Sequence, residues 1–99
     1  MTIEKNSSGA ELTIALAGRL DTTTAPQLEA ELKTALDGVE SLVLDFEKLD
    51  YLSSAGLRVL LAAQKQMNKQ GEMVVRHVNE TIAEVFEVTG FCDILTIED

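Results

Sequence analysis

Two adjacent serines are the residues best placed for chemistry. Ser53 and Ser54 stand in the segment Leu52-Ser53-Ser54-Ala55-Gly56, directly before a run with the apolar spacing of a helix. This position predicts that they lie at or beside a helix N-terminus, where backbone N–H groups lack partners and carry partial positive charge. Such a terminus tolerates a phosphate. The alternative interpretation is that the two serines only cap the helix.

Asp21 and Asp45 are predicted near the ends of adjacent strands, facing the same loop region as Ser54. Asp21 would position the serine or assist the docking of a partner, or it would cap the turn that follows. Asp45 could equally be an ordinary polar residue at a strand end. Thr22, Thr23 and Thr24 could line a docking surface beside Ser54, although capping and turn formation also explain them.

The predicted helix carries two further features of interest. Gly56 lies in its first turn, where glycine costs up to about 1 kcal/mol relative to alanine. Either the missing side chain lets a partner approach the helix backbone, or the helix packs closely on a neighbouring strand. Arg58, Lys65 and Lys69 are basic residues on the same helix. They could contact an acidic patch of a partner or form a solvated face.

The sequence offers no enzyme-like constellation. A hydrolase using Ser54 would need a histidine and an acid in reach. His77, the only histidine, follows a strand far from Ser54 in sequence, and no Gly-x-Ser-x-Gly segment occurs. Cys92, the only cysteine, has no second cysteine or histidine at metal-ligand spacing. We therefore expect no catalytic residue, no metal and no cofactor, and any ATP would belong to a partner.

Length and charge narrow the class of protein. The chain has 99 residues, 45% of them hydrophobic, which suits a single domain over residues 1–99. The net charge of −9 disfavours direct binding to nucleic acid or to anionic lipid. The single cysteine favours a reducing compartment, and we expect a cytoplasmic protein without a signal peptide. The longest apolar run, Val59–Ala63, is too short to insert into a membrane.

The hydrophobic pattern switches repeatedly between periods of two and 3.6 residues. It predicts strands near 3–5, 11–17, 42–46, 72–76 and 93–97, and helices near 25–37, 55–70 and 80–89. Residues 42–46 form a nearly continuous apolar run, typical of a strand covered on both faces. The order β-β-α-β-α-β-α-β predicts an α/β fold with a four- or five-stranded mixed sheet, largely parallel with an antiparallel edge.

Three segments resemble the STAS domain family, named for sulphate transporters and anti-sigma factor antagonists. They are Gly18-Arg19-Leu20-Asp21, Leu44-Asp45-Phe46 and the run from Leu52 through Ser53-Ser54-Ala55-Gly56 to Arg58. The resemblance extends over nearly the whole chain, from about Ile3 to Ile97. It implies a STAS-like fold, in which a mixed sheet is covered by α-helices.

The resemblance also implies a function in partner switching. The unphosphorylated protein would bind an anti-sigma factor that is also a serine kinase, and phosphorylation of Ser54 would release it. A serine phosphatase would reset the switch. Ser53 stands where many family members carry aspartate, and it is the second choice of acceptor. The implied partner-binding residues are Asp21, Thr22, Thr23, Thr24, Ser53, Ser54, Ala55, Gly56 and Arg58.

One alternative from the same family remains open. The chain could be a regulatory STAS subunit of a membrane transport complex, docking on the cytoplasmic ATPase of that complex. Both functions could use the same surface, so the sequence separates them poorly.

Overall fold

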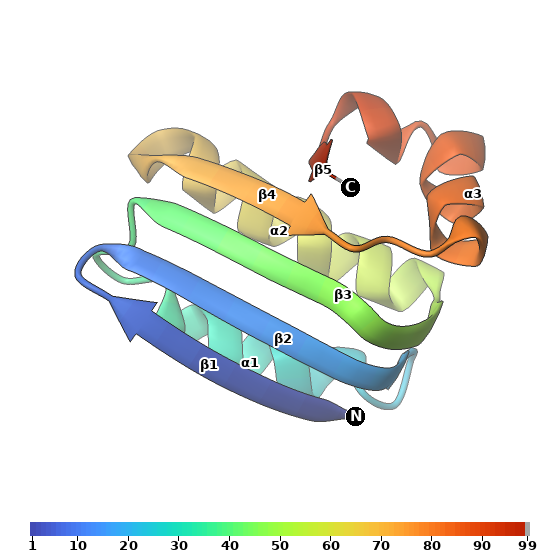
Figure 1. Ribbon diagram of the computed structural model, residues 1–99, viewed down its shortest axis with the longest axis horizontal. Coiled ribbons are helices and arrows are strands. Elements are labelled where there is room, and N and C mark those ends of the chain that lie inside the picture. The colour runs from blue at the N-terminus through green and yellow to red at the C-terminus, as the bar shows by residue number, and fades with distance from the viewer. Residues whose placement is uncertain (99) are drawn as a thin grey trace.

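The computed structural model describes residues 1–98. Its five-stranded sheet has the order β1-β2-β3-β4-β5, and only β1 is antiparallel to its neighbour (Figure 1). The strands are β1 (Thr2–Ser8), β2 (Glu11–Leu20), β3 (Ser41–Leu52), β4 (Glu72–Arg76) and β5 (Thr96–Glu98). The mixed sheet with an antiparallel edge that the sequence predicts is confirmed.

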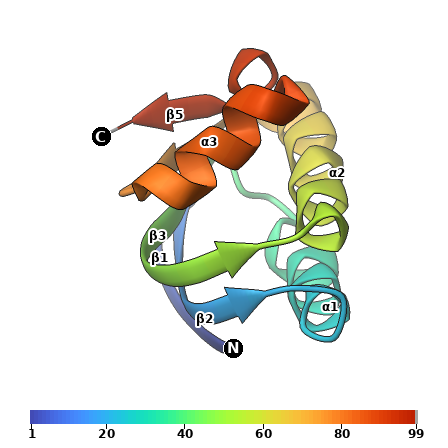
Figure 2. The ribbon, with the colours of Figure 1, turned by 90° about the vertical axis from the view of Figure 1, so that its right-hand side faces the viewer.

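Three helices and one short 3₁₀ turn connect the strands in the predicted order. They are α1 (Ala25–Ala35), α2 (Ser54–Gln70), α3 (Glu80–Thr89) and η1 (Phe91–Asp93). Helices α1 and α2 lie side by side on one face of the sheet, and α3 lies near the carboxyl ends of the strands, where it packs on β3 (Figure 2). None of these helices is long and apolar enough to cross a membrane.

The core lies between the sheet and its helices. Alternate residues of β2 and β3 are buried on this side, and leucines of α1 and α2 pack onto them. Helix α3 joins through Phe86, whose ring centroid lies 6.5 Å from that of Phe46 on β3. The strand and helix residues of this core include Leu12, Ile14, Leu16, Leu42, Leu44, Phe46, Leu28, Leu32, Leu57, Leu60 and Met67.

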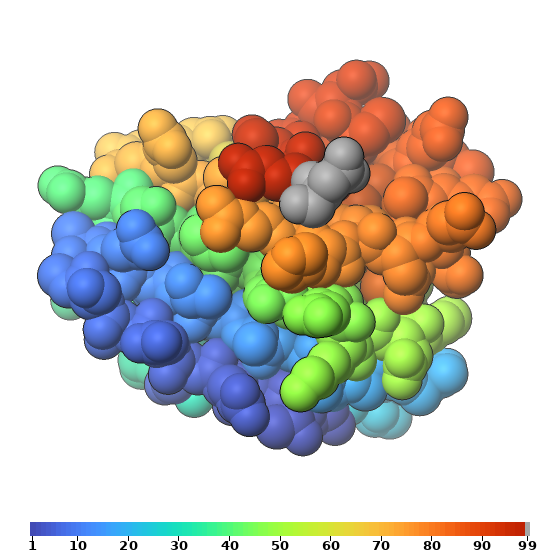
Figure 3. Space-filling model, in the orientation of Figure 1, coloured from blue at the N-terminus to red at the C-terminus, as the bar shows by residue number. Residues whose placement is uncertain are grey.

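Within residues 1–98 no helix covers the other face of the sheet, and the residues of β1, β2, β3 and β4 lie side by side on this open surface (Figure 3). The prediction that the apolar run 42–46 is covered on both faces therefore holds for one face only. Val43 points to the open side and is still only 8% exposed, because Thr13 and Val74 flank it on the neighbouring strands. The apolar run reflects the central place of β3 in the sheet.

Both central strands are longer than the sequence predicts. β2 continues to Leu20 and β3 to Leu52, whereas the pattern predicted ends near residues 17 and 46. The pairing of these strands shifts between Ala15 and Ala17 and again between Gly18 and Arg19. Gly18 has φ 98°, a left-handed conformation that glycine adopts readily. These shifts interrupt the alternation of apolar residues. The sequence pattern therefore did not predict the second half of each strand.

Candidate partner-docking site

The carboxyl ends of β2 and β3 bring the candidate residues together. Leu20 and Leu52 are buried at these two ends, and the backbone N–H of Ser53 donates to the carbonyl oxygen of Leu20 at 2.9 Å. The turn that begins at Asp21 and the start of α2 therefore leave the sheet side by side. Figure 2 shows the two connections next to each other, each leading into its helix.

The two serines have different surroundings. Ser54 is the first residue of α2 and is exposed. Ser53 is the N-cap residue, with extended backbone, and its side chain makes no capping hydrogen bond. The Ser53 Oγ is buried and finds no partner among the described residues. Capping therefore does not explain Ser53, whose hydroxyl is buried, whereas Ser54 is exposed.

Asp21 organises the turn before α1. Its Oδ1 accepts hydrogen bonds from the Thr23 hydroxyl at 2.7 Å, from the Thr23 N–H at 3.0 Å and from the Thr24 N–H at 3.2 Å. The Thr24 hydroxyl accepts from the Asp21 N–H and donates to the Arg19 carbonyl, each at 2.8 Å. The hydroxyl of Thr23, helped by the backbone donors, lowers the pKa of Asp21 to about 2. The geometry favours the interpretation that Asp21 caps this turn and that Thr23 and Thr24 help to form it, although the Thr24 side chain makes no capping hydrogen bond to α1.

Thr22 makes no such bonds within the described chain, and it faces a hollow between the N-terminal ends of α1 and α2. The hollow has a volume of about 190 Å³. Its lining residues are Thr22, Ala25, Pro26, Glu29, Ala55, Arg58 and Val59. Thr22, Ala55 and Arg58, three of the expected partner-binding residues, thus share one surface directly beside Ser54.

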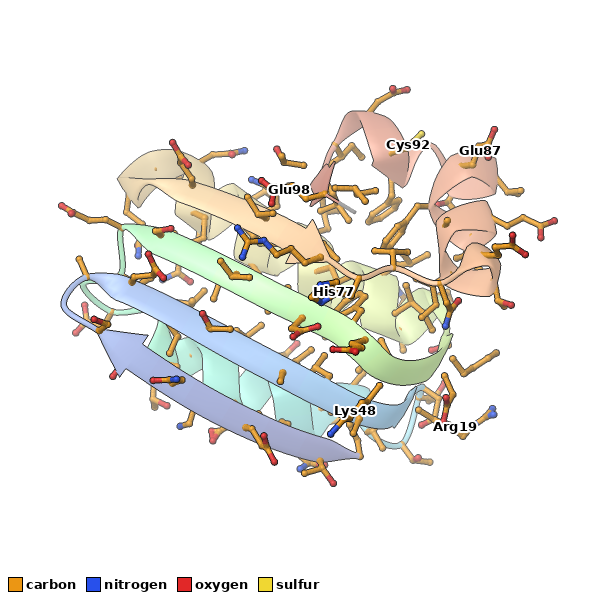
Figure 4. All side chains as sticks on the ribbon, in the orientation of Figure 1. Arg19, Lys48, His77, Glu87, Cys92 and Glu98 are labelled. Carbon is orange, nitrogen blue, oxygen red and sulfur yellow. The ribbon has the colours of Figure 1, made fainter. Side chains whose placement is uncertain are left out.

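Arg19 and Tyr51 add a feature that sequence reasoning missed. They are paired across β2 and β3, and the Arg19 guanidinium carbon lies 4.2 Å from the centre of the Tyr51 ring. Arg19 Nε also lies 3.6 Å from Asp21 Oδ2. Tyr51 is 38% exposed, and it stands three residues before Ser54. Figure 4 labels Arg19 at this end of the sheet. The position of Tyr51 two residues before Ser53 is the feature of the sequence that could have identified this pair.

Gly56 is buried between α2 and the strand ends. A Cβ atom at this position would lie 2.6 Å from Leu52 Cδ1 and 2.7 Å from Leu20 Cγ, well inside contact distance. The geometry therefore favours close packing over direct approach of a partner to this backbone. Arg58, Lys65 and Lys69 are exposed on α2.

Asp45 does not face the same region as Ser54, and the prediction that it lies at a strand end is wrong. β3 continues for seven residues beyond Asp45, to Leu52. On the open face of the sheet, Asp45 Oδ1 lies 2.8 Å from Nδ1 of His77 and accepts the backbone N–H of Glu47 at 3.0 Å. Burial opposes ionisation of Asp45, but the bond to His77, the Glu47 N–H and the nearby charges of His77 and Arg76 together outweigh it and lower the pKa of Asp45. The same bond raises the pKa of His77.

Comparisons with known proteins identify the family of the chain. A family model described as "Mlab, STAS domain" matches residues 3–96. The chain is 45% identical to BtrV of Bordetella bronchiseptica, which is named as an anti-sigma factor antagonist, over 83% of this chain and 72% of that protein. It is 28% identical to the anti-sigma-B factor antagonist of Staphylococcus aureus, over 100% of this chain and 94% of that protein.

Solved structures share the fold. The anti-sigma factor antagonist SpoIIAA in its unphosphorylated form matches with a TM-score of 0.78 and 20% identity, over 99% of this chain and 88% of that chain. Bacillus SpoIIAA in its phosphorylated form matches with a TM-score of 0.77 and 20% identity, over 99% of this chain and 92% of that chain. At this identity the likeness shows the fold alone. The predicted STAS-like fold is confirmed.

Proposed function

This chain belongs to the STAS domain family, and we propose that it acts as an anti-sigma factor antagonist that binds an anti-sigma factor with serine kinase activity. The names of its relatives support the first part of this proposal. The proposed cycle is partner switching: the kinase phosphorylates Ser54, the complex dissociates, and a serine phosphatase restores the binding form. We expect this cycle to operate in the cytoplasm.

The observation that carries the proposal is the contrast between the two serines. Ser54 is exposed at the first position of α2, whereas the Oγ of Ser53 is buried. A kinase needs a hydroxyl that can enter its own active site, and this requirement favours Ser54. The adjoining hollow and the rigid Asp21 turn support a docking surface around it.

Charge supplies the release mechanism. A phosphate at Ser54 adds about −1.5 to −2 charges. The N-terminus of α2 tolerates an anion, so the chain itself keeps its fold. A partner packed over Ser54 would bury that charge, and burying an unpaired charge costs several kcal/mol. Since every 1.4 kcal/mol is tenfold in affinity, we expect phosphorylation to weaken the complex by roughly 100-fold or more.

The chemistry of this cycle belongs to the partners. The kinase would supply ATP and the catalytic base, and the phosphatase would supply the metal-activated water. We propose no catalytic residue in this chain. The expected partner-contacting residues are Thr22, Ser54, Ala55 and Arg58 around the hollow, with Asp21, Thr23 and Thr24 holding the turn in place.

The test begins by capturing the partner on Ser54→Ala, which cannot accept phosphate and should hold a kinase in the binding state. The captured protein is identified by mass spectrometry, purified and incubated with ATP and the wild-type chain. We expect phosphate on the peptide carrying Ser54, retained in Ser53→Ala and lost in Ser54→Ala. Ser54→Asp brings one charge rather than nearly two, and it should weaken binding by about tenfold.

Two outcomes would count against the proposal. Phosphate on Ser53 would mean that the acceptor is Ser53 and not Ser54. If neither Ser54→Asp nor phosphorylation changes the affinity for the partner, the proposed release mechanism is wrong. The docking surface could then still be tested by Arg58→Ala. Capture of a transporter ATPase in place of a kinase would instead favour the role in a membrane transport complex.

A further inference from the structure

Asp45, Glu47 and His77 form a cluster that the proposed switch does not use. One ligand atom from each of these side chains lies within 4.8 Å of the other two. Asp45 and Glu47 belong to β3, and His77 follows β4 directly, next to Arg76, which pairs with Asp45 in the sheet register. Figure 4 labels His77 over the open face of the sheet, between β3 and β4. Two members of the cluster thus stand on β3, and the third directly follows the neighbouring strand β4.

The types of ligand narrow the choice of ion. An imidazole nitrogen with two carboxylates suits Zn²⁺ and similar divalent transition metals, whereas Mg²⁺ and Ca²⁺ prefer oxygen ligands throughout. Three protein ligands leave at least one position free for water. From this arrangement we propose that Asp45, Glu47 and His77 bind one Zn²⁺ ion on the open face of the sheet.

The surroundings suit a cation with bound water. A hollow of about 290 Å³ opens beside the two carboxylates, and it is lined in part by Glu4, Asp45, Glu47 and Lys48. Three carboxylates against one ammonium make this surface acidic, in a chain whose net charge is −9. Arg76, which lies opposite Asp45 in the sheet, is paired with Glu98 at 2.9 Å.

Local geometry holds the cluster without an ion. His77 has φ 58°, which turns the chain at the end of β4, and its Nδ1 lies 2.8 Å from Asp45. The side chains of Asp45 and His77 remain 27% and 47% exposed, so an ion can reach them from solvent. Glu47 is exposed, and one of its carboxylate oxygens already lies within 4.8 Å of ligand atoms of the other two residues. This proposal does not depend on the proposed switch, because β3 continues for seven residues beyond Asp45 before α2 begins.

The test is a calorimetric titration of chelator-treated protein with ZnCl₂. We expect saturable binding of one equivalent, weakened roughly tenfold or more in Asp45→Asn and in His77→Asn. Asparagine is chosen at His77 because it tolerates the positive φ of that residue. Circular dichroism checks that each variant is folded. Co²⁺ in place of Zn²⁺ should give an absorption band that disappears in the same two variants.

Matched variants identify the site. Cys92→Ser removes the only thiol, and Glu98→Gln removes a carboxylate of the neighbouring strand β5; neither should change the affinity. Binding that is lost in Cys92→Ser, or that persists in both His77→Asn and Asp45→Asn, would overturn the proposal, as would the absence of saturable binding in the wild-type chain.

Discussion

At the scale of single residues, Asp21 organises the turn between β2 and α1. Its Oδ1 collects the hydrogen bonds of the turn that leads from β2 into α1. These donors favour the ionised carboxylate, which is why the pKa of Asp21 falls to about 2 from its ordinary value of 3.8. This turn also shapes the surface beside Ser54. Protonation of Asp21 should therefore affect both the stability of the fold and the candidate docking site.

The first prediction concerns Asp21→Asn. The folded-state pKa is lowered, so the charge of Asp21 stabilises the fold above about pH 4, and this contribution is lost as the pH falls toward 2. We expect Asp21→Asn to lower the melting temperature at neutral pH, and the difference from wild type to shrink between pH 4 and pH 2. Thermal melts across this range measure it. Asp50→Asn, an exposed carboxylate on β3, is the control. A difference that stays constant with pH would contradict the argument.

At the scale of elements, two glycines set how closely α2 approaches the sheet. Gly56 begins the helix against Leu20 and Leu52, and Gly71 ends it against the backbone of Glu40. The N–H of Gly71 donates to Met67 at 2.7 Å, and the next residue, Glu72, donates to Glu40 at 2.9 Å. Both ends of α2 are thus located by close contacts that a side chain would obstruct.

Gly56→Ala should destabilise the fold. Helix propensity alone would favour alanine by up to about 1 kcal/mol. Against this, the new Cβ would lie 2.7 Å from Leu20 Cγ, the branch point of a fully buried side chain, and overpacking of this kind costs about 1–3 kcal/mol. We expect a net loss of about 1–2 kcal/mol by urea unfolding. Ser54→Ala, two residues away and exposed, is the control. A more stable Gly56→Ala would show that the leucines move aside.

Gly71→Ala should cost more than Gly56→Ala. A Cβ at Gly71 would overlap the carbonyl oxygen of Glu40 and lie 2.6 Å from its carbonyl carbon. Backbone atoms cannot rotate away as a leucine tip can, so the junction between α2 and β4 must open. We expect a lower urea midpoint than in Gly56→Ala, measured under the same conditions. Equal midpoints would mean that the loop before β3 yields easily.

At the scale of the whole molecule, the proposed switch requires no change of fold. Ser54 lies outside the core, at a helix end where an anion is stabilised by about 0.3–1 kcal/mol. The open face of the sheet and its helix-covered face would keep their structure whether or not Ser54 carries a phosphate. The effect of phosphorylation would therefore be confined to the surface that meets the partner.

The phosphorylated chain should accordingly stay as stable as the unmodified one. We expect a melting temperature equal to that of the unmodified chain or higher by up to about 8 °C, since 1 kcal/mol corresponds to about 4–8 °C in a domain of this size. Amide chemical shifts should change near Asp21–Thr24 and the first turn of α2 and not across β1 or β5. A large fall in melting temperature would indicate that release works through unfolding.

The sequence by itself determined the order of elements, the helix-facing core and the place of the serine pair at the start of a helix. Each of these rests on local information: the period of the apolar residues and the residue types at the boundaries. Leu12, Ile14 and Leu16 alternate in the sequence and are buried in the structure. The motif around Ser54 likewise identified the family, which the comparisons show.

Only the tertiary structure decided which candidate residues meet. Asp45 and His77 are far apart in the chain, and the register of β3 with β4 and the turn at His77 bring them within 2.8 Å. The Ser53 backbone bonds to Leu20 at the end of β2 and its Oγ is buried, whereas Ser54 is exposed. The role of Gly56 follows from its close contacts with Leu20 and Leu52. Register and burial depend on contacts between distant segments, which a local pattern does not encode.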